Sequence, residues 1–170
     1  MPEEKHSPPQ ETKIRDVKKD GSVSKMIDSR MDNKVGELPF QMELDPKTVL
    51  VFKSDKLVNE NVVIQLKITN PTPKRFAYKI KCTSNAIFRV RMPYGFVEPN
   101  SSHTVKITFF SNQIPKPGIH FFIVQHIAAK PSDPQAKWLF AANPKPDGVA
   151  RIACQFQKLD GTQWKEAEKK

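Results

Sequence analysis

The sequence predicts an all-β sandwich, and three observations indicate it. Apolar residues alternate with polar or basic residues over several short segments, as in residues 64–69 and 76–82, which is the pattern of half-buried antiparallel strands. The chain has fifteen prolines and six glycines. Because proline lacks a backbone donor and fixes φ, these residues suit strand ends, edges and turns better than helices. The 170 residues suffice for one domain with a sizeable core and tails.

The expected strands follow one another with turn-forming residues between them. Each has apolar residues at alternate positions or an unbroken apolar run, bounded by Asn, Pro, Gly or charged residues. In chain order they are residues 40–44, 49–52, 64–69, 76–82, 88–92, 105–109, 119–127 and 148–156. The segment 119–127 is the most apolar and predicts a strand covered on both faces.

Two connections between these strands are expected to lack regular structure. Residues 93–99, Pro-Tyr-Gly-Phe-Val-Glu-Pro, read as a turn. Residues 129–147 contain four prolines and the apolar run Trp-Leu-Phe at 138–140, which predicts a long loop. We expect Trp138 to anchor that loop in the core.

Charged tails are expected on both sides of a domain at residues 38–157. Residues 1–37 have too few large apolar side chains to form a core, so we expect disorder. Within them, residues 25–31 are either a solvated extension or a short helix formed on a partner. Residues 158–170 form a second charged tail. The first tail contains hydroxyls that could be phosphorylated, which would make it acidic beside a basic domain. They are Ser7, Thr12, Ser22, Ser24 and Ser29.

The positive charge is concentrated in the predicted domain. Residues 38–157 hold sixteen Lys or Arg against seven Asp or Glu, which is nine of the ten excess positive charges in the chain. Such a field accelerates association with acidic partners. A nucleic-acid site would interleave aromatic platforms with the cations. Phe76 and Tyr78, however, point opposite to Lys79 and Lys81, so we expect an acidic protein and no nucleic acid.

No pattern indicates catalysis, a cofactor or a metal site. The chain lacks a Gly-rich phosphate loop, a G-x-S-x-G motif, an H-E-x-x-H motif and paired carboxylates in apolar surroundings. Cys82 and Cys154 have no C-x-x-C spacing, so we expect buried thiols in a reducing compartment. His120 and His126 are expected at a sheet rim or edge. No apolar run approaches the roughly 20 residues of a membrane span, and no signal peptide is present. We therefore expect a soluble, cytoplasmic, non-enzymatic protein.

The order of short motifs carries a resemblance to a known family. They are Leu-Asp-Pro at 44–46, Leu-Lys-Ile-Thr-Asn-Pro-Thr at 66–72, Tyr-Lys-Ile-Lys-Cys-Thr at 78–83, Val-Arg-Met-Pro-Tyr-Gly-Phe-Val-Glu-Pro at 90–99 and Cys-Gln-Phe at 154–156. Together they resemble the major sperm protein domain, which nematode sperm cytoskeletal proteins and the VAMP-associated proteins share. The resemblance implies a seven-stranded immunoglobulin-like sandwich whose basic face binds proteins.

The VAMP-associated branch binds short acidic peptides that contain two phenylalanines. Lys79, Lys81 and Thr83 match its peptide-binding motif, and Arg151 keeps a cation near the end of the domain. Three positions depart from that motif, which has threonine, lysine and methionine there: they are Cys82, Phe121 and Ile123. That branch also ends in a coiled coil and a membrane anchor. This chain stops at Lys170 with neither, so we expect no membrane tether.

The sequence is closer to the cytosolic branch, whose members form or regulate sperm filaments. Residues 147–151 and 90–95 resemble that branch. We therefore expect a filament-associated component of nematode sperm motility, acting in major sperm protein fibre assembly or its regulation in the pseudopod. Homodimer formation is left open, and a soluble receptor for acidic two-phenylalanine peptides is the alternative. The partner, major sperm protein filaments or an acidic or phosphorylated protein, would contact one outward face carrying Lys79, Lys81, Thr83, Arg89, Arg91 and Arg151.

Overall fold

The computed structural model of the protein describes residues 30–165. The described residues fall into two units, of which residues 30–32 belong to the first and residues 33–165 to the second. The segment 25–29 and the candidate phosphorylation sites lie outside the described residues. Those sites are Ser7, Thr12, Ser22, Ser24 and Ser29.

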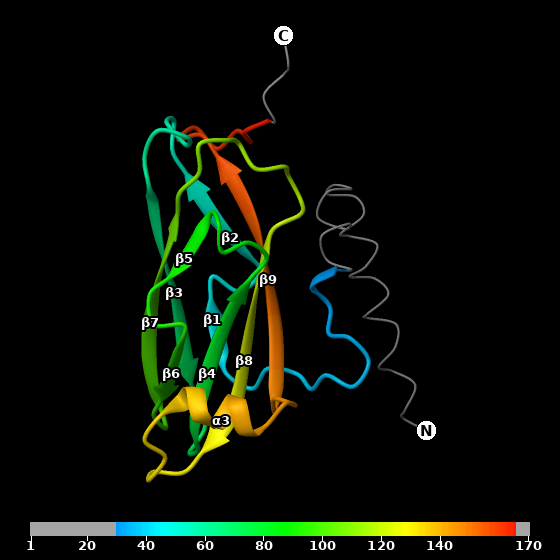
Figure 1. The fold of residues 1–170 in the computed structure, drawn as a ribbon, viewed down its shortest axis with the longest axis vertical. Helices are drawn as coiled ribbons and strands as arrows, with labels where there is room; N and C mark the ends of the chain where they lie inside the picture. Colours follow the sequence, from blue (N-terminus) through cyan, green and yellow to red (C-terminus); the bar gives the residue numbers. More distant parts are fainter. Residues whose placement is uncertain (1–29, 166–170) are drawn as a thin grey trace, which may run out of the picture. The chain divides into compact units, whose positions relative to one another are not determined.

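Two β-sheets pack face to face in the second unit (Figure 1). In spatial order, the five-stranded sheet contains β2 (Val49–Lys53), β9 (Gly148–Gln157), β8 (Phe121–Ala129), β4 (Arg75–Cys82) and β6 (Tyr94–Val97). The four-stranded sheet contains β1 (Glu43–Asp45), β3 (Val62–Asn70), β7 (Ser101–Phe109) and β5 (Phe88–Val90). Neighbouring strands are antiparallel except β2 and β9, which are parallel. The all-β sandwich is confirmed.

Two of the short connections that change sheet relate the nine strands of residues 30–165 to the seven expected. β1 and β2 are separated only by residues 46–48, and β5 and β6 only by residues 91–93. Counting each of these two pairs as one interrupted strand gives seven. The second change occurs where Met92 has a φ of 61°, a left-handed conformation that breaks an extended strand.

The prediction that residues 93–99 form only a turn was wrong, because Tyr94–Val97 pairs with β4 as β6. Gly95 lies opposite Tyr78. A Cβ on this glycine would lie 2.6 Å from the Tyr78 ring, so the glycine makes room for a buried tyrosine. The Tyr78 hydroxyl donates to the Met92 carbonyl at 3.1 Å. Tyr78 therefore helps to hold the crossing segment in place.

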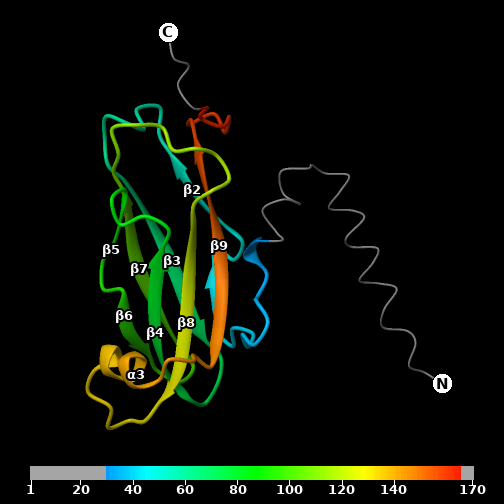
Figure 2. The ribbon, with the colours of Figure 1, turned by 45° about the vertical axis from the view of Figure 1, so that its right-hand side comes forward.

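The predicted loop 129–147 contains a short helix, α3 (Ala136–Ala142), which lies at the lower end of β4 and β6 in Figure 2. Ala136 and Phe140 are buried against Ala77 and Ile127. Trp138 is 61% exposed, so the prediction that it anchors the loop was wrong. Positions four apart share one face of a helix, and the intervening position 138 lies off that face.

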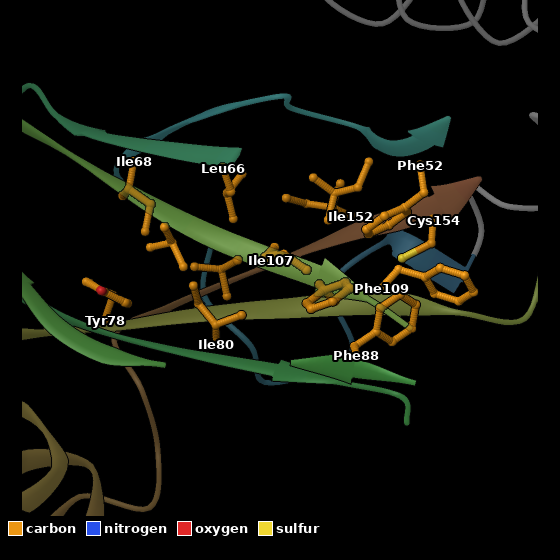
Figure 3. Close-up of a cluster of buried hydrophobic side chains, with 14 of the residues drawn as sticks. Phe52, Leu66, Ile68, Tyr78, Ile80, Phe88, Ile107, Phe109, Ile152 and Cys154 are labelled. Carbon is orange, nitrogen blue, oxygen red and sulfur yellow. The ribbon is translucent and has the colours of Figure 1, made fainter. Parts of the chain in front are cut away.

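Aromatic residues fill one end of the core between the sheets. Figure 3 shows Phe52, Phe88 and Phe109 near Cys154, with Tyr78 at the opposite end of the cluster. The Phe52 ring lies 5.5 Å from Phe88 and 5.8 Å from Phe109, measured between ring centroids. Cys154 is buried and Cys82 is half-buried, and both are free thiols. Burial raises the pKa of the Cys154 thiol, which keeps it protonated and unreactive.

His126 corrects the expectation of a rim or edge histidine, because its side chain is fully buried. Its ring packs 4.9 Å from Phe40 and 4.5 Å from Phe76. The backbone N–H of Gln41 donates to His126 Nε2 at 2.9 Å. This bond ties the chain before β1 to the middle of β8. The expectation that this strand is covered on both faces was wrong along most of its length: Phe121, Ile123 and Gln125 of β8 are only half-buried. His126 is buried because it lies on the inner face, as Phe122 and Val124 do.

Segments on both sides of residues 38–157 also contact the sandwich. On the N-terminal side, the Arg151 guanidinium donates to both carboxylate oxygens of Glu37. The Trp164 indole N–H donates to the Ser54 carbonyl at 2.8 Å, and Gln163 forms a β-bridge with Gln157. The packed unit therefore includes residues that the sequence assigned to the tails.

Candidate protein-binding face

The outer face of the five-stranded sheet brings together residues from three strands. In β4, Phe76, Tyr78 and Ile80 are buried. Successive side chains of a strand point to opposite faces, so Lys79 and Lys81 project outward. In the same register, Lys81 lies opposite Ile123 of β8 and Ile123 lies opposite Arg151 of β9. We call this surface the five-stranded face, with Lys79, Lys81, Phe121, Ile123 and Arg151 as its principal residues.

The two lysines of β4 are available to a partner. Lys81 is exposed and Lys79 is half-buried. The Lys79 Nζ lies 5.5 Å from the ring centroid of Tyr94, and the Lys137 Nζ lies 6.0 Å from the same ring. Within residues 30–165, neither Lys79 nor Lys81 forms an ion pair. Their positive charge is therefore directed to solvent.

Half-buried apolar side chains lie beside these lysines. Phe121 and Ile123 are neither fully exposed nor buried, whereas Phe122 and Val124 between them are in the core. Residues 121–124 are all apolar, so no alternation of polarity distinguishes the outward Phe121 and Ile123 from the inward Phe122 and Val124 in the sequence. The face therefore combines apolar contact area with cations.

Thr83 extends the same face just beyond the end of β4. Its Oγ1 lies 2.8 Å from His120 Nδ1, and the backbone N–H of Phe121 is directed at the same oxygen at 3.4 Å. The Thr83 backbone N–H donates to the Phe121 carbonyl at 3.2 Å. Burial lowers the pKa of His120. Thr83 is therefore held in position by β8 and its approach.

Arg151 is engaged within the chain. Its guanidinium donates to both carboxylate oxygens of Glu37, at 2.7 and 2.9 Å. Its side chain is only 5% exposed. The hydrogen bond from Arg151 holds the pKa of Glu37 at about 2, below its ordinary 4.5. No pattern in the sequence indicates this pair, because the two residues lie in different predicted segments.

Arg89 and Arg91 lie on the other sheet, so the six predicted binding residues do not share one face. Arg89 belongs to β5 and lies opposite Thr108 of β7, and its Cζ is 5.0 Å from the Phe110 ring centroid. The chain changes sheet between β4 and β5. The same alternation therefore directs the cations of these two strands to opposite sides of the sandwich. The binding role of all six residues remains a prediction.

The fold is that of a known domain. The sequence profile of the MSP (major sperm protein) domain matches residues 41–147. The chain belongs to the MSP domain family. MSP domains are typically binding modules rather than enzymes.

Relatives of this MSP domain occur in nematodes and in vertebrates. An uncharacterized Caenorhabditis elegans protein, ZC262.1, is 36% identical over 98 residues, which cover 56% of this chain and 72% of that protein. Human vesicle-associated membrane protein-associated protein A is 33% identical over 120 residues, which cover 67% of this chain and 46% of that protein. The chain thus spans about half the length of this second relative.

Two solved structures share the fold. SSP-19, an MSP-domain-like protein of C. elegans, superposes with a TM-score of 0.52 at 24% identity, covering 64% of this chain and 92% of its own. WR4, a C. elegans MSP family member, gives a TM-score of 0.56 at 20% identity, covering 67% and 95%. These likenesses establish the MSP fold for this chain.

Two further observations concern the described part of the chain. No helix in residues 30–165 is long and apolar enough to cross a membrane. In the same residues, no three His, Cys, Asp or Glu side chains gather as a metal site would need.

Proposed function

We propose that this MSP domain docks onto an acidic protein through the five-stranded face. The observation that carries the proposal is the position of Lys79 and Lys81, which have no ion pair within residues 30–165, beside the half-buried Phe121 and Ile123. Cations around an apolar centre resemble the rim and core of a protein interface.

The two kinds of side chain would contribute differently to binding. Carboxylates of the partner would pair with Lys79 and Lys81 near solvent. This attraction mainly increases the association rate, and added salt reduces the increase because it screens the charges. Apolar groups covering Phe121 and Ile123 would supply free energy at about 25 cal/mol per Å² removed from water. We expect a partner that presents an apolar side chain next to acidic ones.

We further propose that the partner belongs to the filament system of nematode sperm, so that the protein acts in the cytoplasm of the pseudopod. The relatives that support this assignment are ZC262.1, SSP-19 and WR4, all from C. elegans. An accessory role suits the domain because nine of the ten excess charges lie in residues 38–157. An acidic or phosphorylated filament surface would complement that charge.

Sedimentation tests the filament assignment. The purified protein is centrifuged with and without MSP filaments at near-physiological salt, and the pellets are compared. We expect the protein in the pellet only when filaments are present. Recovery in the supernatant alone would refute the filament assignment, while leaving open an acidic partner of another kind.

A second candidate is a soluble receptor for acidic peptides with two phenylalanines. It is favoured by the 33% identity to human vesicle-associated membrane protein-associated protein A over 120 residues. Lys79, Lys81 and Thr83 also match the motif of that branch. Titration with a fluorescent peptide of this type separates the two candidates. Micromolar affinity would favour the receptor, and binding weaker than about millimolar would exclude it.

A further inference from the structure

One margin of the sandwich is open between its two sheets. β5 is the last strand of the four-stranded sheet, and β6 pairs with β4 only from Phe76 to Lys79. Beyond that point, none of the strands in residues 30–165 lies beside the end of β4 on this side. In Figure 2, β5 lies above β6 along the same margin. We call this region, from Ile80 to Cys82 and from Phe88 to Arg91, the β4–β5 margin.

A pocket of about 290 Å³ opens at the β4–β5 margin. Ile80 and Cys82 of β4 line one side, Phe88 and Val90 of β5 line the other, and Pro93 lies where the chain crosses to β6. A water molecule occupies about 30 Å³ of liquid. The pocket is thus large enough to admit an aliphatic side chain.

Backbone groups of β5 face this opening. In an antiparallel strand, alternate residues direct their N–H and C=O groups to opposite neighbours. The Ile87 carbonyl accepts from Phe110, and the Arg91 N–H donates to the Lys106 carbonyl, so these residues bond toward β7. Val90, between Arg89 and Arg91, therefore directs its N–H and C=O away from β7. An extended segment could pair with Val90 as an additional strand.

Positive charges flank the margin. Arg89 and Arg91 are exposed on the outer side of β5, and Lys81 is exposed on the outer side of β4. Charged side chains on an edge strand discourage indiscriminate pairing. A strand that pairs with β5 must therefore bring negative charge, and carboxylates at alternate positions would face Arg89 and Arg91.

The opposite edge strand of the four-stranded sheet, β1, shows how an acidic edge segment pairs with this sheet. There, β1 has the sequence Glu43-Leu44-Asp45. Leu44 packs against the core, while Glu43 and Asp45 are exposed and Asp45 lies opposite Lys67. An acidic, an aliphatic and a second acidic residue thus alternate on an edge strand beside a cation.

We propose that the β4–β5 margin binds an extended segment of a partner protein with an alternating acidic, aliphatic and acidic pattern. The segment adds a strand beside β5, its carboxylates pair with Arg89 and Arg91, and its aliphatic side chain enters the pocket between Ile80 and Val90. This site is separate from the five-stranded face. It gives Arg89 and Arg91 a binding role that does not require them to share a face with Lys79.

A synthetic peptide tests the proposal on the full-length protein. The probe is acetyl-Glu-Leu-Glu-Leu-Glu-amide, followed by amide NMR spectra of the labelled protein. We expect shifts centred on Val90 and slowed exchange of its N–H. A peptide with Lys in place of Glu, and one with Ser in place of Leu, should each bind at least tenfold more weakly. Equal binding of all three peptides would overturn the proposal.

Matched variants locate the site. Arg89→Glu with Arg91→Glu should weaken binding at least tenfold, whereas Lys67→Glu with Lys74→Glu, exposed lysines away from β5, should change it less than threefold. Lys79→Asp should also leave binding within about threefold, which distinguishes this site from the five-stranded face. Shifts centred on Phe121 and Ile123 would contradict the proposal.

Self-association is the remaining outcome to distinguish, because a second copy carries Glu43-Leu44-Asp45. We expect the protein alone to sediment without self-association through β5. If it does self-associate, if Arg89→Glu with Arg91→Glu abolishes that assembly and if the peptide does not compete with it, the occupant is a second copy and the proposal of a partner segment is wrong. All variants are compared by their amide spectra, so that loss of binding in an unfolded variant is recognised.

Discussion

Arg151 donates hydrogen bonds to both carboxylate oxygens of Glu37, a residue 114 positions earlier, at 2.7 and 2.9 Å. The pair fastens the segment before β1 to the outer face of β9. It also means that a cation predicted to contact a partner is matched from within the chain. The charge offered by the five-stranded face therefore comes chiefly from Lys79 and Lys81.

Removing the Glu37 carboxylate should destabilise the domain. Because Glu37→Gln weakens two charge-assisted hydrogen bonds to a side chain that is 5% exposed, we expect a loss of about 1.5–3 kcal/mol in the free energy of unfolding at pH 7. Urea denaturation measures it. Glu43→Gln, an exposed glutamate on β1, is the control and should change stability by no more than about 0.5 kcal/mol. Equal effects of the two substitutions would show that the pair contributes nothing.

The same pair predicts a pH dependence in acid. The pKa of Glu37 is about 2 in the folded protein and 4.5 ordinarily. The unfolded chain therefore takes up this proton first as the pH falls. The stabilisation is complete above pH 4.5 and is lost between pH 4.5 and 2. Stability curves of the wild type and Glu37→Gln should converge over this range, and parallel curves would contradict the assignment.

Protonation of His126 should lower the free energy of unfolding over a higher pH range than protonation of Glu37 does. Burial lowers its pKa from 6.5 to about 4, so the unfolded chain binds the proton first on acidification. The contribution of the neutral ring is complete above pH 6.5 and declines as the pH falls to 4. His126→Gln should be less stable at pH 7, because the ring packing against Phe40 and Phe76 is lost, and should show a shallower decline between pH 6.5 and 4. An unchanged slope, measured by thermal unfolding, would refute this origin.

The helix α3 predicts a contrast between two aromatic residues. Phe140 is 9% exposed and Trp138 is 61% exposed. Phe140→Ala should therefore cost about 3–5 kcal/mol through the cavity it leaves, whereas Trp138→Ala should stay within about 0.5 kcal/mol. Chemical denaturation of both variants compares them directly. A larger loss for Trp138→Ala would reinstate it as the anchor of this segment.

Much of the fold could be predicted because the alternation of apolar residues reflects burial directly. The period of two in residues 64–69 and 76–82 matches β3 and β4, in which the inward residues fill the core. The pattern did not predict β6, where glycine and proline signalled a turn. Gly95 lies in that strand because Tyr78 occupies the space of its side chain. Such a requirement comes from a distant residue and leaves no local signal.

The candidate site was predictable residue by residue but not as a surface. Alternation correctly placed Lys79 and Arg89 outside the core. It could not place them relative to each other, because a change of sheet between two strands reverses the direction in which outward residues point. Nor could local sequence predict that Glu37 reaches Arg151. Both relationships depend on how strands are ordered in space.

The most direct test of the account compares two pairs of charge reversals in one filament-sedimentation assay. Lys79→Asp with Lys81→Asp alters the five-stranded face, and Lys67→Asp with Lys106→Asp alters exposed lysines of the other sheet by the same charge. We expect the wild type and the second variant to pellet with MSP filaments alike, and the first variant to remain in the supernatant while still folded. Undiminished pelleting of the Lys79→Asp, Lys81→Asp variant would contradict docking through this face.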